Sequence, residues 1–318
     1  MNTSKASIGW RFLGRALVFL LGLLAVVYFG RELVRFWPSV VTVTFTPRVA
    51  GAVAIAALVL ALSGVVDAWS WGWLLRGLSL PAQPRNAMGI FLVAQFAKYV
   101  PGNFGQHVGR LALSRAQGLP YPTVVLSIVI ENGFALGAGA FVAAVSLAAG
   151  ITGSTGGVVR PAWLLALAIF GWFVGAMVLR WFLAHPPPWL RRLLKLDRPV
   201  TLEKHLVVGY FLLHVTSYAA LGATLVLVVF GLSGGASAEL WRVALAAMAG
   251  WFAGYLVPGA PAGLGVREAT LTALLTPLCG PTVALSSALL WRSSALLADG
   301  ALFLVGLALR VPRKPNSP

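Results

Sequence analysis

The stretch AMGIFLVAQFAKYVPG at residues 87–102 is an apolar run that ends before it is long enough to cross a membrane. It holds 14 residues before Pro101, whereas a transmembrane helix needs about 20. A second run, VALAAMAGWFAGYLVPG at residues 243–259, ends in the same way after 15 residues. Proline fixes φ and lacks an amide proton, and glycine permits positive φ, so a Pro-Gly pair ends a helix. Both stretches therefore predict short helices that turn back.

The composition of the whole chain indicates that lipid is its solvent. Of 318 residues, 59% are hydrophobic and 10% are charged, against roughly 25% charged in an ordinary soluble domain. In lipid every backbone polar group must be satisfied internally, which leaves helices or a closed barrel. Apolar runs such as 207–232 are far longer than the roughly 10-residue alternating strands of a barrel. We therefore expect an all-α, polytopic membrane helix bundle that forms a single transmembrane domain over residues 1–318.

Six other apolar runs are long enough to span a bilayer as complete helices. They lie at residues 12–29, 49–73, 122–150, 162–183, 206–232 and 282–309. Each short run is followed by a second short stretch with charges near its start, so we expect two re-entrant helical hairpins at about 87–118 and 243–279. Irregular backbone at membrane depth is tolerated only inside protein or beside a water-filled cavity. The alternative is that each hairpin is two short, complete spans.

The charged residues predict the topology. The chain has 24 Lys and Arg against 8 Asp and Glu, and the cations lie between apolar runs rather than in an aromatic-rich basic domain that would bind nucleic acid. With a cytoplasmic N-terminus and non-crossing hairpins, sixteen cations fall inside and six outside. We therefore expect a multi-pass protein of the inner (plasma) membrane with both termini cytoplasmic. The basic loop at about 184–205 either lies on anionic headgroups or only sets this topology.

Two further features narrow the class of protein. The first apolar run has a basic start but no small-residue cleavage site after it, so we expect a retained helix rather than a signal peptide. Cys279 is the single cysteine, which excludes an internal disulfide and a cysteine-based metal cluster. We expect no cofactor and no metal.

The two short runs resemble each other. Both place a tyrosine and Val-Pro-Gly after a short apolar helix, and three spans lie between them. An odd number of crossings inverts the second copy relative to the first, as in transporters built from inverted repeats with discontinuous helices that meet near the midplane. Chance similarity between Gly- and Pro-rich segments is the alternative. The turn residues would be Pro101, Gly102 and Gly105 in the first hairpin, and Pro258, Gly259, Gly263 and Gly265 in the second.

Ionisable side chains inside the membrane are costly, so each is a functional candidate. Glu131 and Arg292 lie about 14 and 15 Å into oppositely directed spans, which predicts a contact between them, directly or through the hairpins. Asp299 follows Arg292 by two helical turns on the same face. Arginine binds phosphate well, so the cations near the turns are candidate headgroup ligands. The structural alternatives are a buried pair that only fixes packing and, for Arg110, a topology-setting charge. The expected substrate-binding residues are Lys98, Arg110, Glu131, Arg267, Glu268, Arg292 and Asp299.

Two motifs carry a family resemblance. KYVPGNFGQHVGR at residues 98–110, followed by Ser127 and Glu131, and VPGAPAGLGVRE at residues 257–268 together resemble the transmembrane, flippase-like domain of lysylphosphatidylglycerol synthases and its stand-alone relatives. The resemblance implies a bundle with two re-entrant elements that moves a lipid, or a lipid-linked sugar, between leaflets. We expect no soluble aminoacyl-transfer domain here, so synthase chemistry is not implied. Members often show Glu-Arg and Gly-Glu where this chain has Glu131-Asn132 and Gly105-Gln106.

The leading hypothesis is a flippase-like protein that binds and translocates an anionic phospholipid or a polyprenyl-phosphate-linked lipid. No metalloprotease, P-loop or nucleophile-elbow motif is present, so we do not expect an enzyme. Three alternatives stay open: an intramembrane transferase with Glu131 as base, an ion-coupled transporter of a small solute, and a scaffold for a lipid-modifying enzyme. Whether the chain forms a homo-oligomer also stays open.

Overall fold

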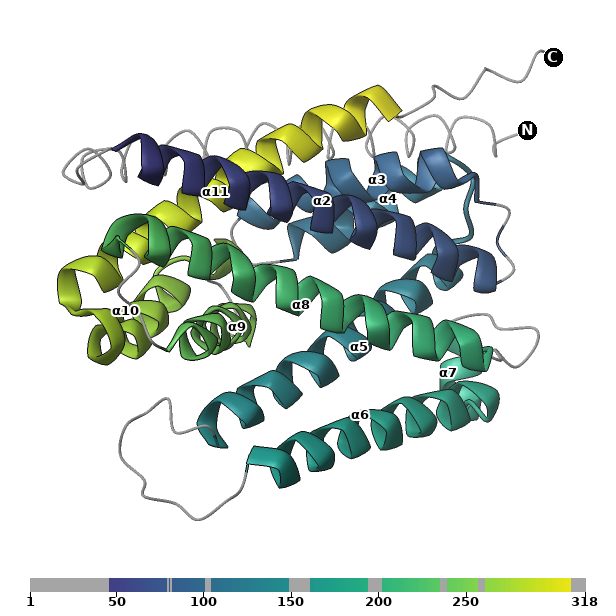
Figure 1. Cartoon of the computed structure of the whole chain (residues 1–318). Coiled ribbons are helices and arrows are strands. Elements are labelled where there is room, and N and C mark those ends of the chain that lie inside the picture. The colour runs from purple at the N-terminus through teal and green to yellow at the C-terminus, as the bar shows by residue number, and fades with distance from the viewer. Residues whose placement is uncertain are drawn as a thin grey trace.

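The computed structural model describes residues 46–309 except 79, 81, 101–103, 149–160, 194–201, 235–238 and 257–260. Within these residues the regular structure is helical throughout, with no strand, as the composition predicts (Figure 1). The expected span at 12–29 lies outside the described residues, as do the turn residues Pro101, Gly102, Pro258 and Gly259.

Five long helices occupy the positions of the other expected spans. They are α2 (Pro47–Gly77), α5 (Tyr121–Ala148), α6 (Pro161–Ala184), α8 (Lys204–Ser233) and α11 (Pro281–Leu309). Along their described side chains, α2, α8, α11 and the Tyr121–Gly139 part of α5 are long and apolar enough to cross a membrane. Helices of about 30 residues measure about 45 Å, longer than the roughly 30 Å hydrocarbon layer, so tilt is expected.

The first hairpin consists of α3 (Pro84–Phe96), the 3₁₀ turn η1 (Ala97–Tyr99) and α4 (Gly105–Ala116). Proline at the first position of α3 suits a helix start, which explains why the helix begins three residues before the expected 87. The return helix lies directly against the end of α3. A Cβ atom on Gly105 would overlap the carbonyl oxygen of Ala97, so this close approach requires glycine.

The second hairpin consists of α9 (Leu240–Leu256), the 3₁₀ turn η2 (Pro261–Gly263) and α10 (Val266–Cys279). Its tip has left-handed backbone, with φ of 48° at Ala262, 73° at Gly263 and 80° at Gly265. The Gly265 N–H donates to the Glu268 carboxylate over 2.7 Å, which caps the start of α10. Like the first hairpin, α9 begins three residues before the expected boundary, at 240 rather than 243.

The two hairpins open toward opposite ends of the bundle and meet at their tips. The first joins the ends of α2 and α5 at the right of Figure 1, and the second joins the ends of α8 and α11 at the left. In the middle, η1 contacts η2. Around the tips α2 packs on α8, α3 packs on α11, and α9 packs on α5. The short helix α7 (Pro188–Leu193) lies in the expected basic loop.

Candidate functional site

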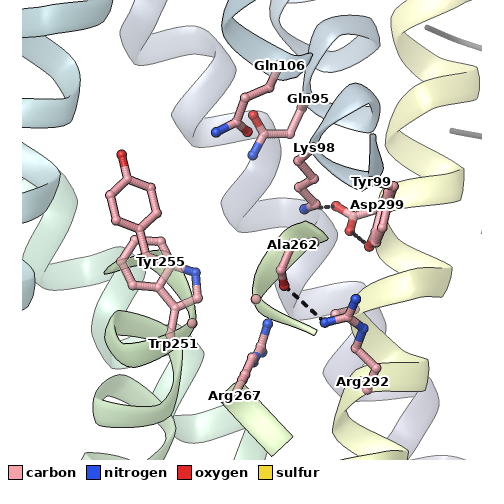
Figure 2. A pocket seen from close by; sticks show the side chains of 13 residues that line it. Gln95, Lys98, Tyr99, Gln106, Trp251, Tyr255, Ala262, Arg267, Arg292 and Asp299 are labelled. Atoms are coloured by element: carbon pink, nitrogen blue, oxygen red, sulfur yellow. Dashed lines mark hydrogen bonds and ion pairs between the residues drawn. The ribbon is translucent and has the colours of Figure 1, made fainter. Parts of the chain in front are cut away.

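A small pocket lies where the two hairpin tips meet α11 (Figure 2). Its volume is about 110 Å³, which accommodates several waters or one phosphate-sized group. Four of the seven expected substrate-binding residues line it: Lys98, Arg267, Arg292 and Asp299. Three cations and one carboxylate give these lining groups a summed charge of +2.

Arg292 is the best-buried cation of the pocket, with 3% of its surface exposed. Its Nη1 donates to the Ala262 carbonyl at 3.1 Å and to Glu268 Oε1 at 3.3 Å, so two residues of the second hairpin hold it. Its Nε and Nη2 atoms are buried and have no hydrogen-bond partner among the described residues. Buried charged donors without an acceptor are costly, so this guanidinium has capacity to bind an anion.

Arg267 points into the pocket below Ala262 in Figure 2. Its guanidinium carbon lies 3.8 Å from the centre of the Trp291 ring, a cation–π contact that fixes the side chain without neutralising it. Within the part of the chain that the structure describes, Arg267 forms no ion pair. Its neighbour Glu268 faces Arg292 instead, so the second hairpin contributes one unneutralised cation.

Lys98 is neutralised within the pocket. Its Nζ lies 2.8 Å from Asp299 Oδ1, and the Tyr99 hydroxyl donates to Oδ2 of the same carboxylate. These contacts tie η1 to α11. Arg292 and Asp299 both line the pocket, as their spacing of two helical turns predicts.

Arg110 and Glu131 lie outside the pocket. They form a bidentate pair that links α4 to α5, with Arg110 Nη2 3.1 Å from Glu131 Oε1 and Nη1 bonded to Oε2. The guanidinium of Arg110 also lies over the rings of Phe91 and Trp71, at 3.9 and 5.4 Å. Arg110 is buried within the bundle, whereas the Glu131 side chain is 18% exposed.

The direct Glu131–Arg292 contact is not formed. Glu131 pairs with Arg110 and Arg292 pairs with Glu268, so each forms its ion pair with a charged residue of a hairpin instead. The expectation was based on equal depth, but the return helices α4 and α10 each bring an opposite charge closer. Each of the two charges therefore pairs with the return helix of a different hairpin, Glu131 with α4 and Arg292 with α10.

Sequence reasoning missed the uncharged wall of the pocket. Trp251 and Tyr255 from α9 line it, together with Gln95 and Gln106 from the first hairpin. Trp251 and Tyr255 lie four residues apart, hence on one helix face, directly before the second Val-Pro-Gly. That spacing was a usable signal, although aromatic residues in membrane helices are common. In the described residues, no group of three or more His, Cys, Asp or Glu side chains is arranged to hold a metal.

Comparison with known proteins gives one match. The family model of the lysylphosphatidylglycerol synthase TM region matches residues 15–302. Neither a curated protein nor a solved structure matches the chain significantly. The matched range includes all the helices around the pocket except the last residues of α11.

Proposed function

The chain belongs to the family of lysylphosphatidylglycerol synthase transmembrane regions, and from this premise we propose that it binds an anionic lipid headgroup in the pocket and moves the lipid between leaflets. Membership makes it a membrane protein related to lipid modification or flipping. The observation that carries the proposal is the buried guanidinium of Arg292, whose Nε and Nη2 atoms have no hydrogen-bond partner among the described residues and lie in the same pocket as the unneutralised Arg267. Guanidinium groups bind phosphate oxygens through paired N–H donors.

The proposed transport path uses the two hairpins as re-entrant elements. At 13 residues, α3 is about 20 Å long, well short of the roughly 30 Å hydrocarbon layer. A hairpin that ends at midplane depth places a cationic pocket inside the membrane, where irregular backbone is tolerated because protein surrounds it. The headgroup would occupy the pocket, whose 110 Å³ is far too small for acyl chains, and these would stay in the bilayer.

We also propose that α2 to α5 and α8 to α11 are two inverted copies. If one copy is exchanged for the other, each of these helix contacts maps onto another observed contact. The contact between α2 and α8 maps onto itself, and the contact between α3 and α11 maps onto the contact between α9 and α5. The charge pairs correspond too, because Arg110 on α4 pairs with Glu131 on α5, and Glu268 on α10 pairs with Arg292 on α11. Such repeats rock against each other around a central site in alternating-access transporters. Both termini would be cytoplasmic, as the charge bias predicts.

A leaflet assay in proteoliposomes tests this function. Fluorescent phosphatidylglycerol is placed in both leaflets, and a membrane-impermeant quencher reports how fast the inner pool reaches the outside. We expect Arg292→Gln and Arg267→Gln each to slow exchange about tenfold or more, since a charged hydrogen bond contributes about 1.5–3 kcal/mol. The matched control is Arg76→Gln at the exposed end of α2. Exchange by both variants at the wild-type rate would remove the pocket from the path.

The transferase alternative has less support from the pocket. A base acting on a lipid-linked substrate needs a carboxylate with a free oxygen near the bound headgroup. Asp299 is the carboxylate among the described lining residues, and both of its oxygens are engaged by Lys98 and Tyr99. Glu131, the expected base, is paired with Arg110 outside the pocket.

A further inference from the structure

Asp67 is an acidic side chain inside a membrane-spanning helix, and it does not line the pocket. It lies on α2, ten residues before Gly77, and therefore about 15 Å from that end of the helix. Glu131 lies ten residues into α5, at a similar depth from the same end of the bundle, because the first hairpin joins these two helix ends. A charge near the middle of a bilayer is costly, and such residues mark ion pathways and proton relays.

Among the described residues, Asp67 has a hydrogen-bond donor but no counter-ion. The helices α2 and α8 pack along each other (Figure 1), and the Ser217 hydroxyl of α8 donates to Asp67 Oδ1 over 3.1 Å. Glu131, Glu268 and Asp299 are each paired with a cation, whereas no described lysine or arginine forms an ion pair with Asp67. A carboxylate without a counter-ion in apolar surroundings can be neutralised by a proton instead.

A histidine lies one turn from this serine on the same face of α8. His214 precedes Ser217 by three residues, and its Nδ1–H donates to the Tyr210 carbonyl over 2.7 Å. Because a carbonyl can only accept, this bond fixes the tautomer and leaves Nε2 free to accept a proton. Ser217 and His214 therefore form a polar stripe that leads from Asp67 toward the start of α8.

The charged groups around Asp67 connect it to the pocket. Glu131 on α5, Arg110 on α4 and Lys98 on η1 all lie close enough to interact electrostatically with its carboxylate. Tyr218 on α8 lies within the same range. Lys98 also lines the pocket, so an anion in the pocket and the Asp67 carboxylate interact with the same cation.

The helices α3 and α11 also pack on α2 and complete the surroundings of Asp67. The charged residue of α3 is Arg85, which is exposed at the start of the helix. Those of α11 are Arg292 and Asp299, which line the pocket. A negative charge on Asp67 therefore opposes an anion in the pocket, and a proton on Asp67 removes that opposition. By linkage, the anion strengthens proton binding by the same factor.

We propose that Asp67 is a proton-binding site, and that each anionic headgroup crosses the membrane together with one proton carried by Asp67. The proton comes from water on one side, and because the Ser217 hydroxyl occupies Oδ1, it bonds to Oδ2. It returns to water on the other side when the headgroup leaves. The charges of headgroup and proton cancel, so the cargo crosses without net charge. This inference deepens the proposed function and rests on it.

Transport in phosphatidylcholine vesicles that contain a trace of fluorescent phosphatidylglycerol tests the coupling. With the membrane potential clamped by valinomycin and equal potassium, the wild type should concentrate the probe in the leaflet on the alkaline side. The asymmetry should approach about tenfold for a gradient of about one pH unit. Asp67→Asn should exchange the probe without this accumulation, and should respond to a membrane potential instead, because the lipid then crosses with its charge uncompensated. Protein-free vesicles give the background.

The matched control is Glu203→Gln, which also changes a carboxylate to an amide. Glu203 is the N-cap residue of α8 and is 71% exposed, so this variant should accumulate the probe as the wild type does. If Asp67→Asn fails to fold, Ser217→Ala tests the same site. It removes a donor that favours the ionised carboxylate, so phosphatidylglycerol binding should persist to higher pH than in the wild type. An unchanged pH dependence in Ser217→Ala would count against the site.

The outcomes separate the coupling from the proposed function. Accumulation by Asp67→Asn equal to that of the wild type would overturn the coupling alone, as would wild-type exchange that ignores the pH gradient. Loss of exchange in a folded Asp67→Asn would overturn it too, because an amide mimics the protonated carboxyl of the loaded form. Wild-type vesicles that exchange no phosphatidylglycerol at all would overturn the proposed function as well.

Discussion

The two hairpins have similar sequences at their tips, yet they are held in the bundle in different ways. In the first hairpin, α3 buries eight of its 13 residues and α4 six of its 12, whereas in the second hairpin α9 buries five of its 17 and α10 three of its 14. Both cations considered for the first hairpin are paired, Lys98 with Asp299 and Arg110 with Glu131. In the second, Arg267 forms no ion pair among the described residues, and the tip has left-handed backbone.

From this difference we infer distinct roles for the two hairpins under the proposed function. The first hairpin is packed and neutralised, so we expect it to be the fixed side of the pocket. The second is less buried, holds Arg292 through Ala262 and Glu268, and contributes the unneutralised Arg267. A site that must bind and release needs one side that can move, and regions with few buried contacts are those that open first.

The largest effect is expected from a substitution that removes the ion pair between the first hairpin and α5. Arg110→Met keeps the packing on Phe91 and Trp71 but leaves the Glu131 carboxylate without its partner. Removing one member of a buried pair costs about 3–5 kcal/mol, so the thermal unfolding midpoint in detergent should fall steeply. Replacing the pair together, with Arg110→Met and Glu131→Leu, should recover most of the loss.

The control for this change is Arg85→Met, on α3 of the same hairpin but exposed, which should alter stability by less than about 0.5 kcal/mol. Arg267→Met in the second hairpin should also have a small effect on stability, because no carboxylate among the described residues depends on it. Equal destabilisation by Arg110→Met and Arg267→Met would contradict the difference between the hairpins.

The next effect concerns the tip of the first hairpin. In Gly105→Ala the added methyl would overlap the Ala97 carbonyl oxygen, and backbone cannot move aside as a flexible side chain does. Overpacking of this kind costs about 1–3 kcal/mol, and we expect the upper part of that range. Differential scanning fluorimetry measures it. Gly51→Ala on α2, where a Cβ meets nothing within 4 Å, is the control and should be neutral or slightly stabilising. A neutral Gly105→Ala would show that the two helix ends are farther apart than described.

Sequence patterns predicted the elements of this fold better than the pairing of its charges. Apolar length and Pro-Gly pairs placed five long helices and both hairpins within a few residues, because these signals are local. The positions of Glu131 and Arg292 along their helices also follow from the rise per residue. Their partners were not, because depth along a helix leaves the direction of a side chain around the axis undetermined. The sequence did not identify Trp251 and Tyr255 as lining residues for the same reason, because which side of α9 faces the pocket depends on the packing of the other helices.

A smaller effect tests whether Lys98 is a ligand or a counter-ion. Lys98→Met leaves the Asp299 carboxylate unneutralised beside Arg292, so binding of phosphatidylglycerol should weaken about tenfold. If Lys98 serves only to neutralise Asp299, then adding Asp299→Asn should restore binding. Native mass spectrometry with the same lipid measures both variants. If the double variant does not recover phosphatidylglycerol binding, Lys98 is a direct ligand of the headgroup. The first hairpin would then bind the headgroup as the second does.

The smallest effect sharpens the contrast between the two tips. At Gly265 an added Cβ would meet nothing within 4 Å, but φ is 80°, so the cost of Gly265→Ala is conformational and should be about 1 kcal/mol. Gly265→Asn should cost about the same as Gly265→Ala, because ψ is −47°, outside the αL region in which asparagine is favoured over alanine. At Gly105, where φ is not positive, asparagine should be worse than alanine because it is larger. The two substitutions, measured by thermal unfolding, should therefore be equivalent at Gly265 and differ at Gly105. A larger cost of asparagine at both positions would mean that steric contact governs both turns.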